Sequence, residues 1–244
     1  QRIDVVADPG VGPSLYLDGV PHFRAGDLTA LPILLADFPG ALRPHPAGEP
    51  ALVLGSGSFG SAAHLQRLGH AVTVVELDRE VAALGLRYLG SLSGLAAPAL
   101  QLVIDDGRRF LARAPDAARY GVIALDVPAP YHLQTALLYT ADFYRLARAH
   151  LARDGVVAIS LCDGLAGAVG SAIAAASSRS LPPATTTSSS TSKSGKTMAV
   201  MATKCSSAPA STPPPAAVRS FAFLSSQTFF PTFPAMMQMV PRMA

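Results

Sequence analysis

Residues 51–60, ALVLGSGSFG, decide the fold of this 244-residue chain. The apolar beginning of this stretch is expected to be a short buried strand, which runs into a Gly-x-Gly-x-x-Gly pattern formed by Gly55, Gly57 and Gly60. Glycines let the backbone turn tightly and approach a ligand closely, and a helix that follows offers free N–H groups. Between a strand and a helix, this pattern predicts a nucleotide-binding loop, and a plain tight turn is the alternative.

Strands and helices alternate regularly on the C-terminal side of this loop. Strands are expected at 51–55, 71–76, 100–104, 120–126 and 155–161, and helices at 61–69, 79–89, 108–114 and 141–152. This alternation predicts an α/β fold with a Rossmann-like parallel sheet that carries helices on both faces. Right-handed crossovers place the C-terminal ends of all the strands on one edge of the sheet, which is where ligands bind.

The regions that flank this alternation have a different character. Residues 1–28 are expected to form β structure, including a hairpin at 14–19, SLYLDG, which turns at an Asp-Gly pair. A short helix is expected at 31–41, and a Pro-rich linker at 43–50. The predicted organisation is an N-terminal β-hairpin region with its linker at 1–49, a Rossmann-like domain at 50–176 and a low-complexity tail at 177–244.

The tail differs from the rest of the chain in composition. It is rich in Ser, Thr and Pro and lacks periodicity, and all sixteen acidic residues of the chain lie at or before Asp163. Such a segment cannot easily bury enough apolar surface to offset its ordering entropy. We therefore expect either a natural disordered tail or a frame-shifted translation of a GC-rich gene.

Composition also limits the partners of the protein. The part up to Asp163 carries sixteen acids and thirteen Arg, so the basic pI of 9.1 comes from the tail. The basic residues of the tail are scattered, and we expect no nucleic-acid binding. No apolar run reaches the roughly 18 residues of a membrane span. Cys162 and Cys205 form neither a disulfide framework nor a metal site. We expect a cytoplasmic protein that binds no metal.

Three acidic residues follow successive strands. Glu76 ends the second strand, where a carboxylate can accept both hydroxyls of an adenosine ribose, and Asp78 is expected to cap the next helix. Asp106, followed by Gly107, either accepts a hydrogen bond from an adenine amino group or caps its own helix. Asp126 ends the fourth strand, where it suits a general base or an amine-binding group, and a turn residue is the alternative. Together they predict an adenosine-containing cofactor, most consistent with an S-adenosylmethionine derivative.

Motifs over about 14–165 resemble the spermidine synthase (polyamine aminopropyltransferase) family. The matching stretches are LYLDGVPHF at 15–23, LVLGSGSFG at 52–60, VVELDREV at 74–81, IDDGRRFL at 104–111, YGVIALDVPAP at 120–130 and LLYTADFYRLARAHLARDGVVAIS at 137–160. They match in order and in spacing. The resemblance implies a methyltransferase-type Rossmann-like domain preceded by a small β-hairpin region.

The resemblance also implies a reaction and a set of residues. The family transfers an aminopropyl group from decarboxylated S-adenosylmethionine to an amine such as putrescine, and its members commonly form homodimers. By resemblance, Asp126 would be the catalytic base. The implied donor-binding residues are Gly55, Gly57, Ser58, Gly60, Glu76, Asp106 and Gly107. The implied amine-side residues are His22, Asp27, Tyr131 and His132.

The chain departs from the family pattern on the amine side. His22 replaces a Gln, Leu31-Pro32 replace a Tyr-His pair, Ser58 replaces an Asp, and Ala129 replaces a second Asp. A dicationic polyamine favours several carboxylates around it, so the donor-side acids are kept better than the amine-side ones. Two other interpretations stay open: an S-adenosylmethionine-dependent methyltransferase, and a non-catalytic nucleoside-binding relative.

Overall fold

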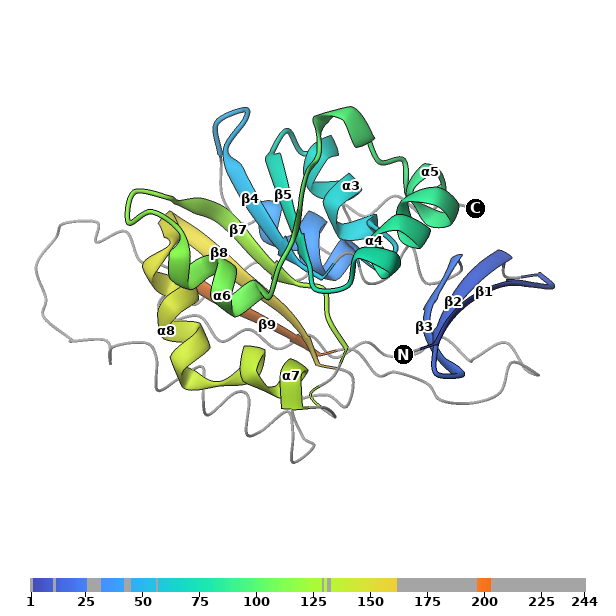
Figure 1. Cartoon of the computed structure of the whole chain (residues 1–244). Helices are drawn as coiled ribbons and strands as arrows, with labels where there is room; N and C mark the ends of the chain where they lie inside the picture. The colour runs from blue at the N-terminus through green and yellow to red at the C-terminus, as the bar shows by residue number, and fades with distance from the viewer. Residues whose placement is uncertain are drawn as a thin grey trace, which may run out of the picture.

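The chain folds around two β-sheets (Figure 1). The computed structural model describes residues 2–10, 12–25, 32–41, 45–55, 57–128, 130, 133–161 and 197–202. The larger sheet is parallel, with the strand order β6 (Gln101–Ile104), β5 (Ala71–Glu76), β4 (Pro50–Leu54), β7 (Tyr120–Leu125), β8 (Leu151–Leu161) and β9 (Thr197–Ala202). The predicted α/β fold with a parallel sheet is therefore confirmed.

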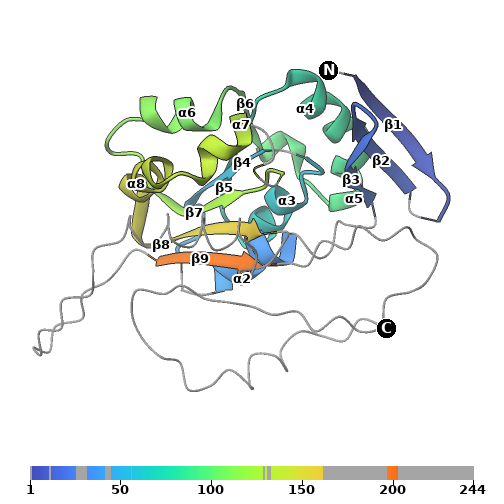
Figure 2. The ribbon, with the colours of Figure 1, turned by 90° about the horizontal axis from the view of Figure 1, so that it is seen from below.

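Helices cover both faces of the larger sheet (Figures 1 and 2). One face packs against α3 (Gly60–Arg67) and α4 (Arg79–Gly85), and the other against α6 (Gly107–Arg113) and α8 (Ala141–Ala149). Shorter helical segments are η2 (Ile33–Asp37), α2 (Phe38–Ala41), η3 (Leu86–Gly90), α5 (Ser91–Ser93), η4 (Ala97–Ala99), α7 (Leu133–Ala136) and η5 (Leu137–Tyr139).

The two-residue period of a strand divides the apolar side chains between these two faces. On β4, Leu52 and Leu54 pack beneath α6 and α8, whereas Ala51 and Val53 pack beneath α3 and α4. The strand is buried on both sides, which explains why its sequence is continuously apolar instead of alternating. The core of the protein therefore lies in two layers, one on each side of β4 and β7.

The N-terminal region forms a separate antiparallel sheet of β1 (Ile3–Asp8), β2 (Gly12–Leu17) and β3 (Val20–Arg24), which lies beside α4 (Figure 1). Asp18 and Gly19 connect β2 to β3, with φ values of 50° and 80°. A two-residue hairpin turn of this kind needs positive φ at both positions, which Asp-Gly tolerates. The predicted hairpin is therefore confirmed, and β1 adds a third strand to it.

Two helices do not end where their sequence patterns predict. The helix expected at 79–89 ends as α4 at Gly85 and continues through the π-helical turn η3 and the short α5 to Gly94, whose φ is +75°. A glycine in this conformation is a common helix terminator. The helix expected at 141–152 ends at Ala149, because Leu151 already pairs with Tyr120 of β7.

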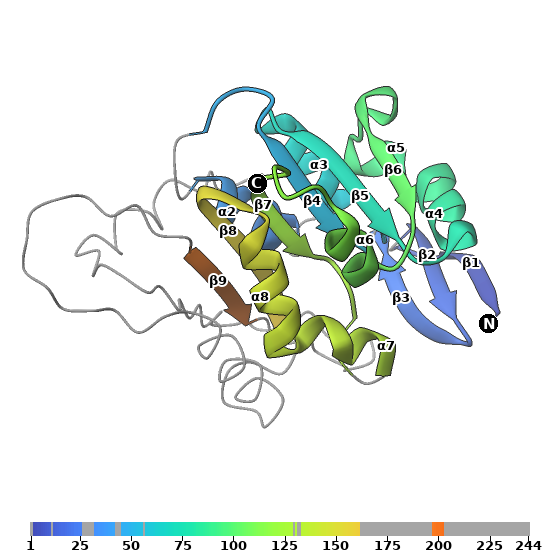
Figure 3. The same cartoon turned by 60° about the vertical axis from the view of Figure 1, so that its left-hand side comes forward.

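Strand β9 lies in the tail, where the sequence analysis expected no regular structure. Its six residues, TMAVMA, pair in parallel with β8 from Val156 opposite Thr197 to Leu161 opposite Ala202 (Figure 3). These six residues therefore form a regular strand within the predicted low-complexity tail, whose overall character stays a prediction. A short apolar run within a Ser/Thr/Pro-rich sequence carries too little local pattern to predict a strand, and only the pairing with β8 reveals it.

In the parts of the chain that the structure covers, no helix combines the length and the apolar character needed to cross a bilayer.

The pairing of β9 with β8 can be tested with proline substitutions at Ala199 and Val200. Consecutive residues of a strand direct their N–H groups to opposite sides, so only one of the two N–H groups can bond to β8. The proline that removes this bond should lower the free energy of unfolding by about 1 to 3 kcal/mol, and the other proline should have a small effect. Urea denaturation of both variants measures the difference. Equal stability of both variants and the parent chain would show that β9 does not pair.

Candidate active site

The glycine loop joins β4 to α3 at the centre of the larger sheet. Gly55 has a φ of +88°, and a side chain there would collide with the carbonyl of Asp126 at the end of β7. Gly57 has a φ of +44°, and a side chain there would overlap the ring of Phe23 on β3. These two glycines are needed because the backbone is close-packed against β7 on one side and β3 on the other.

Strand β3 brings His22 and Phe23 to this loop. Their rings meet edge to face, with 4.3 Å between the centroids. Burial lowers the pKa of His22 to about 4. The imidazole is therefore neutral at physiological pH, and it brings a polar but uncharged group to the loop. The predicted amine-side residue His22 thus lies beside the predicted donor loop.

Ser58 is the residue of the loop that replaces the family's aspartate. It is buried, and its hydroxyl accepts a hydrogen bond from the N–H of Gly60 at 3.2 Å. The side chain is therefore used to hold the turn into α3, in the manner of a short polar residue that bonds to the backbone nearby.

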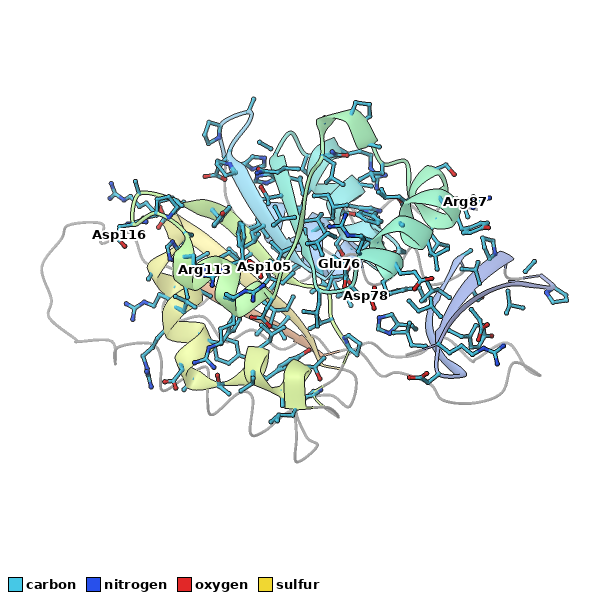
Figure 4. The ribbon with its side chains drawn as sticks, in the orientation of Figure 1. Glu76, Asp78, Arg87, Asp105, Arg113 and Asp116 are labelled. Carbon is cyan, nitrogen blue, oxygen red and sulfur yellow. The ribbon has the colours of Figure 1, made fainter. Side chains whose placement is uncertain are left out.

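Glu76 lies at the C-terminal end of β5, the strand next to β4. Its side chain is only 9% exposed, and it accepts a hydrogen bond from the N–H of Asp78 at 3.0 Å (Figure 4). Asp78 in turn accepts from the N–H groups of Glu80 and Val81 and caps α4, as the sequence predicts. Glu76 is thus held by backbone at the edge of the sheet where ligands are expected.

Asp105 and Asp106 follow β6, one strand further out. The carboxylate of Asp106 accepts from the N–H of Arg109 at 2.8 Å, so the capping role considered for it is present. Asp105 forms an ion pair with the Arg109 guanidinium, which lowers the pKa of this carboxyl. Gly107, the first residue of α6, packs against Leu54 at the end of β4. The structure leaves the adenine-binding role of Asp106 a prediction.

Asp126 follows β7 and is more deeply buried than Glu76, with 5% of its surface exposed. Its N–H donates to the carbonyl of Leu54 at 2.8 Å, which ties it to the start of the glycine loop. Its Oδ2 accepts a hydrogen bond from the hydroxyl of Ser61, on α3, at 2.7 Å. The carboxylate therefore lies directly beneath the loop, and it is not a solvated turn residue.

The surroundings of Asp126 set its pKa. Burial, with a smaller contribution from the negative charge of Glu76, raises the pKa of Asp126 to about 6, although the Ser61 hydrogen bond acts in the opposite direction. The charge of Glu76, at the end of β5, thus acts on Asp126, which follows β7, across the end of β4. A buried carboxylate whose pKa is close to neutrality is suited to exchange a proton with a bound substrate.

No three His, Cys, Asp or Glu side chains gather as a metal ligand set within the described ranges.

The sequence model of the spermine/spermidine synthase domain matches residues 33–161. The chain belongs to the spermine/spermidine synthase family. It is 31% identical over 121 residues to a polyamine aminopropyltransferase of Korarchaeum cryptofilum, with 48% of this chain and 36% of the relative covered. It is 30% identical over 165 residues to a polyamine aminopropyltransferase of Nitrosomonas europaea, with 66% and 49% covered. The chain thus spans about half or less of the length of these relatives.

Solved structures of the family have the same fold. A spermidine synthase in complex with the transition-state analogue AdoDATO superposes with a TM-score of 0.65 at 25% identity, over 75% of this chain and 62% of that one. The spermidine synthase of Thermotoga maritima superposes with a TM-score of 0.62 at 24% identity, over 75% and 60%. The resemblance to the spermidine synthase family is therefore confirmed.

Some of the predicted site residues lie close together in the structure, and others lie further away or outside the described residues. The glycine loop, Glu76 and Asp126 meet at the ends of three neighbouring strands, β5, β4 and β7. Asp106 and Gly107 lie at the end of the next strand, β6. Asp27, Tyr131 and His132 lie outside the described residues.

Two residues at this family site were missed by sequence reasoning. Ser61 contacts Asp126, and Phe23 covers Gly57. The sequence contains a weak indication for Ser61, since it is a polar residue in the first turn of a helix that starts at the edge of the sheet where ligands bind. The sequence contains no indication for Phe23, because the alternation of residues within a short strand does not reveal what the strand packs against.

The raised pKa of Asp126 predicts a pH-dependent effect of Asp126→Asn on stability. The folded pKa of about 6 exceeds the unfolded value of about 3.9, so the native protein loses stability as pH rises between these values. Asn has no such loss. The variant should therefore gain about 2 to 3 kcal/mol relative to the parent between pH 4 and pH 8. Denaturant unfolding at both pH values measures this gain.

A matched control is Asp116→Asn, because Asp116 is exposed. This variant should follow the parent at both pH values. An Asp126→Asn effect that is the same at pH 4 and pH 8 would contradict the raised pKa.

Proposed function

We propose that the protein transfers an aminopropyl group from decarboxylated S-adenosylmethionine to an amine. Membership of the spermine/spermidine synthase family and relatives named polyamine aminopropyltransferases support this reaction. So does the likeness to a spermidine synthase in complex with a transition-state analogue. The observation that carries the proposal is the buried carboxylate of Asp126, placed beneath the glycine loop and within the electrostatic influence of Glu76.

The donor would bind at the ends of β4, β5 and β6. In this proposal Glu76 accepts the ribose hydroxyls, and the turn at Gly55 and Gly57, where φ is positive, lets the backbone approach the nucleoside; the burial of Glu76 at the end of β5 supports this role. Asp106 would accept from the adenine amino group. Its capping bond to Arg109 does not prevent this, because a carboxylate has two oxygens and several acceptor sites.

The acceptor amine must lose a proton before it can react. An alkylamine has a pKa near 10 and arrives as an ammonium ion at neutral pH. Asp126, with a pKa of about 6, is ionised at that pH and can take this proton. The nitrogen lone pair then forms a bond to the aminopropyl carbon next to the sulfonium. The carbon–sulfur bond breaks, and its electron pair stays on sulfur, so that methylthioadenosine leaves as a neutral thioether.

Among the described residues, the part of the site expected to bind the amine contains fewer negative charges than a dicationic polyamine favours. Ser58 is neutral and bonded to backbone, and His22 is neutral because it is buried. We therefore define the acceptor by its reactive group, a primary alkylamine, and take putrescine as the first compound to test.

Incubation of the full chain with decarboxylated S-adenosylmethionine and putrescine should release methylthioadenosine, measured by chromatography. Asp126→Asn should lower kcat by about 10²- to 10⁴-fold, because the general base is lost. Asp116→Asn serves as the control.

The kcat/KM of the parent should fall about tenfold per pH unit below pH 6, where Asp126 is protonated. Release of S-adenosylhomocysteine from S-adenosylmethionine, without methylthioadenosine, would point to a methyltransferase instead.

Donor binding can be tested separately from turnover. Glu76→Gln should weaken methylthioadenosine binding about 10- to 100-fold, since hydrogen bonds to a charged group contribute about 1.5 to 3 kcal/mol. Asp78→Asn is the matched control, because Asn caps α4 as well as Asp does and leaves Glu76 in place. Isothermal titration calorimetry measures both. Unchanged affinity in Glu76→Gln would remove Glu76 from the donor site.

A further inference from the structure

Ser61 makes a contact with Asp126 that the motif pattern does not include. The two residues are 65 positions apart, on α3 and after β7, yet the Ser61 hydroxyl lies 2.7 Å from Asp126 Oδ2. Ser61 is fully buried and Asp126 is 5% exposed. The hydrogen bond is therefore shielded from water, where it is stronger than at a surface.

The direction of the Ser61 side chain is informative. A serine within a helix commonly bonds back to a carbonyl of the preceding turn. Here the hydroxyl instead donates to a carboxylate on a different strand. Hydrogen bonds with one ionised partner are shorter and stronger than neutral ones, and a distance of 2.7 Å is consistent with such a bond. A simple space-filling role for Ser61 would need no hydroxyl.

The bond also limits what Asp126 can do. A carboxylate that leaves water needs a polar partner, and Ser61 supplies one through Oδ2. Because Ser61 takes up part of the acceptor capacity of Oδ2, Oδ1 is the oxygen better able to receive a proton from a substrate. The orientation of the carboxylate is thus set from α3, the helix that begins at the glycine loop.

We infer that Ser61 is a positioning residue for the base of the reaction: it holds Asp126 through Oδ2, keeps it in the charged form and directs Oδ1 to the acceptor amine. This inference rests on the proposed function, in which Asp126 takes the proton. It assigns to Ser61 no contact with the substrate.

Two groups act on the charge of Asp126 in the described part of the chain, and they act in opposite directions. The Ser61 hydroxyl favours the carboxylate form, whereas the negative charge of Glu76 on β5 and burial favour the protonated form. Removal of the hydroxyl leaves burial and Glu76 unopposed. The pKa of Asp126 should then rise.

Ser61→Thr and Ser61→Val form a matched pair, because the two side chains have the same shape and differ in the hydroxyl alone. Any steric cost of the extra methyl groups is common to both. In Ser61→Val, the acid limb of the kcat/KM profile should move up by about one pH unit relative to Ser61→Thr, which is a tenfold change in the protonation equilibrium. The kcat should fall about tenfold with the KM of the donor unchanged. Ser61→Thr should keep the profile of the parent.

A titration of the Asp126 carboxyl by carbon-13 NMR in the same two variants needs no turnover. A higher Asp126 pKa in Ser61→Val than in Ser61→Thr supports the inference, and identical values overturn it. If the titrations differ but no amine yields methylthioadenosine, the contact stands while the proposed reaction fails. If turnover occurs and neither the titration nor the pH profile distinguishes the two variants, the role of Ser61 fails while the reaction stands.

Discussion

The hydrogen bond from the Asp126 N–H to the Leu54 carbonyl, 2.8 Å long, joins the ends of β4 and β7, and the candidate site is built around this junction. β4 and β7 are neighbours in the sheet although β5 and β6 come between them in the sequence. The strand order therefore reverses at β4, and open α/β sheets bind their ligands at such a point. The glycine loop leaves from one side of this junction, and Asp126 from the other. Without the close approach that Gly55 allows, these two parts could not meet.

The junction also explains why charged groups are tolerated in the interior. Asp126 and Glu76 are both buried carboxylates, and their proximity opposes the ionisation of Asp126. The protein offsets this through hydrogen bonds to each of them, from Ser61 to Asp126 and from the Asp78 backbone to Glu76. A buried carboxylate of this kind lowers the free energy of unfolding at neutral pH. Groups with such perturbed pKa values are typical of sites where protons are exchanged. The buried carboxylate with the raised pKa is thus the residue on which the proposed transfer depends.

The N-terminal sheet and strand β9 have different relations to this junction. β3 packs Phe23 onto Gly57, so the small sheet contacts the predicted donor site itself. β9 pairs with β8 at the opposite edge of the larger sheet, where it extends the hydrogen-bonded ladder away from the site (Figure 3). Unpaired strand edges are prone to association with other chains. β9 therefore covers the edge of β8, whereas β3 contacts the glycine loop.

Some features could be predicted from local patterns in the sequence, because each depends on residues close together in the chain. They are the strands around the glycine loop, the hairpin turn at Asp18-Gly19, the cap at Asp78 and the positions of the acids at the ends of β5 and β7. The tertiary structure alone decided that Ser61 donates to Asp126, that Phe23 covers Gly57, and that the apolar run in the tail joins β8. It also showed that the Asp106 side chain caps α6, whereas the adenine-binding role of this residue stays a prediction. Each of these facts concerns which groups become neighbours once the chain closes on itself. Such contacts join residues far apart in the sequence, and propensity or periodicity, which operate within one element, carry no information about them.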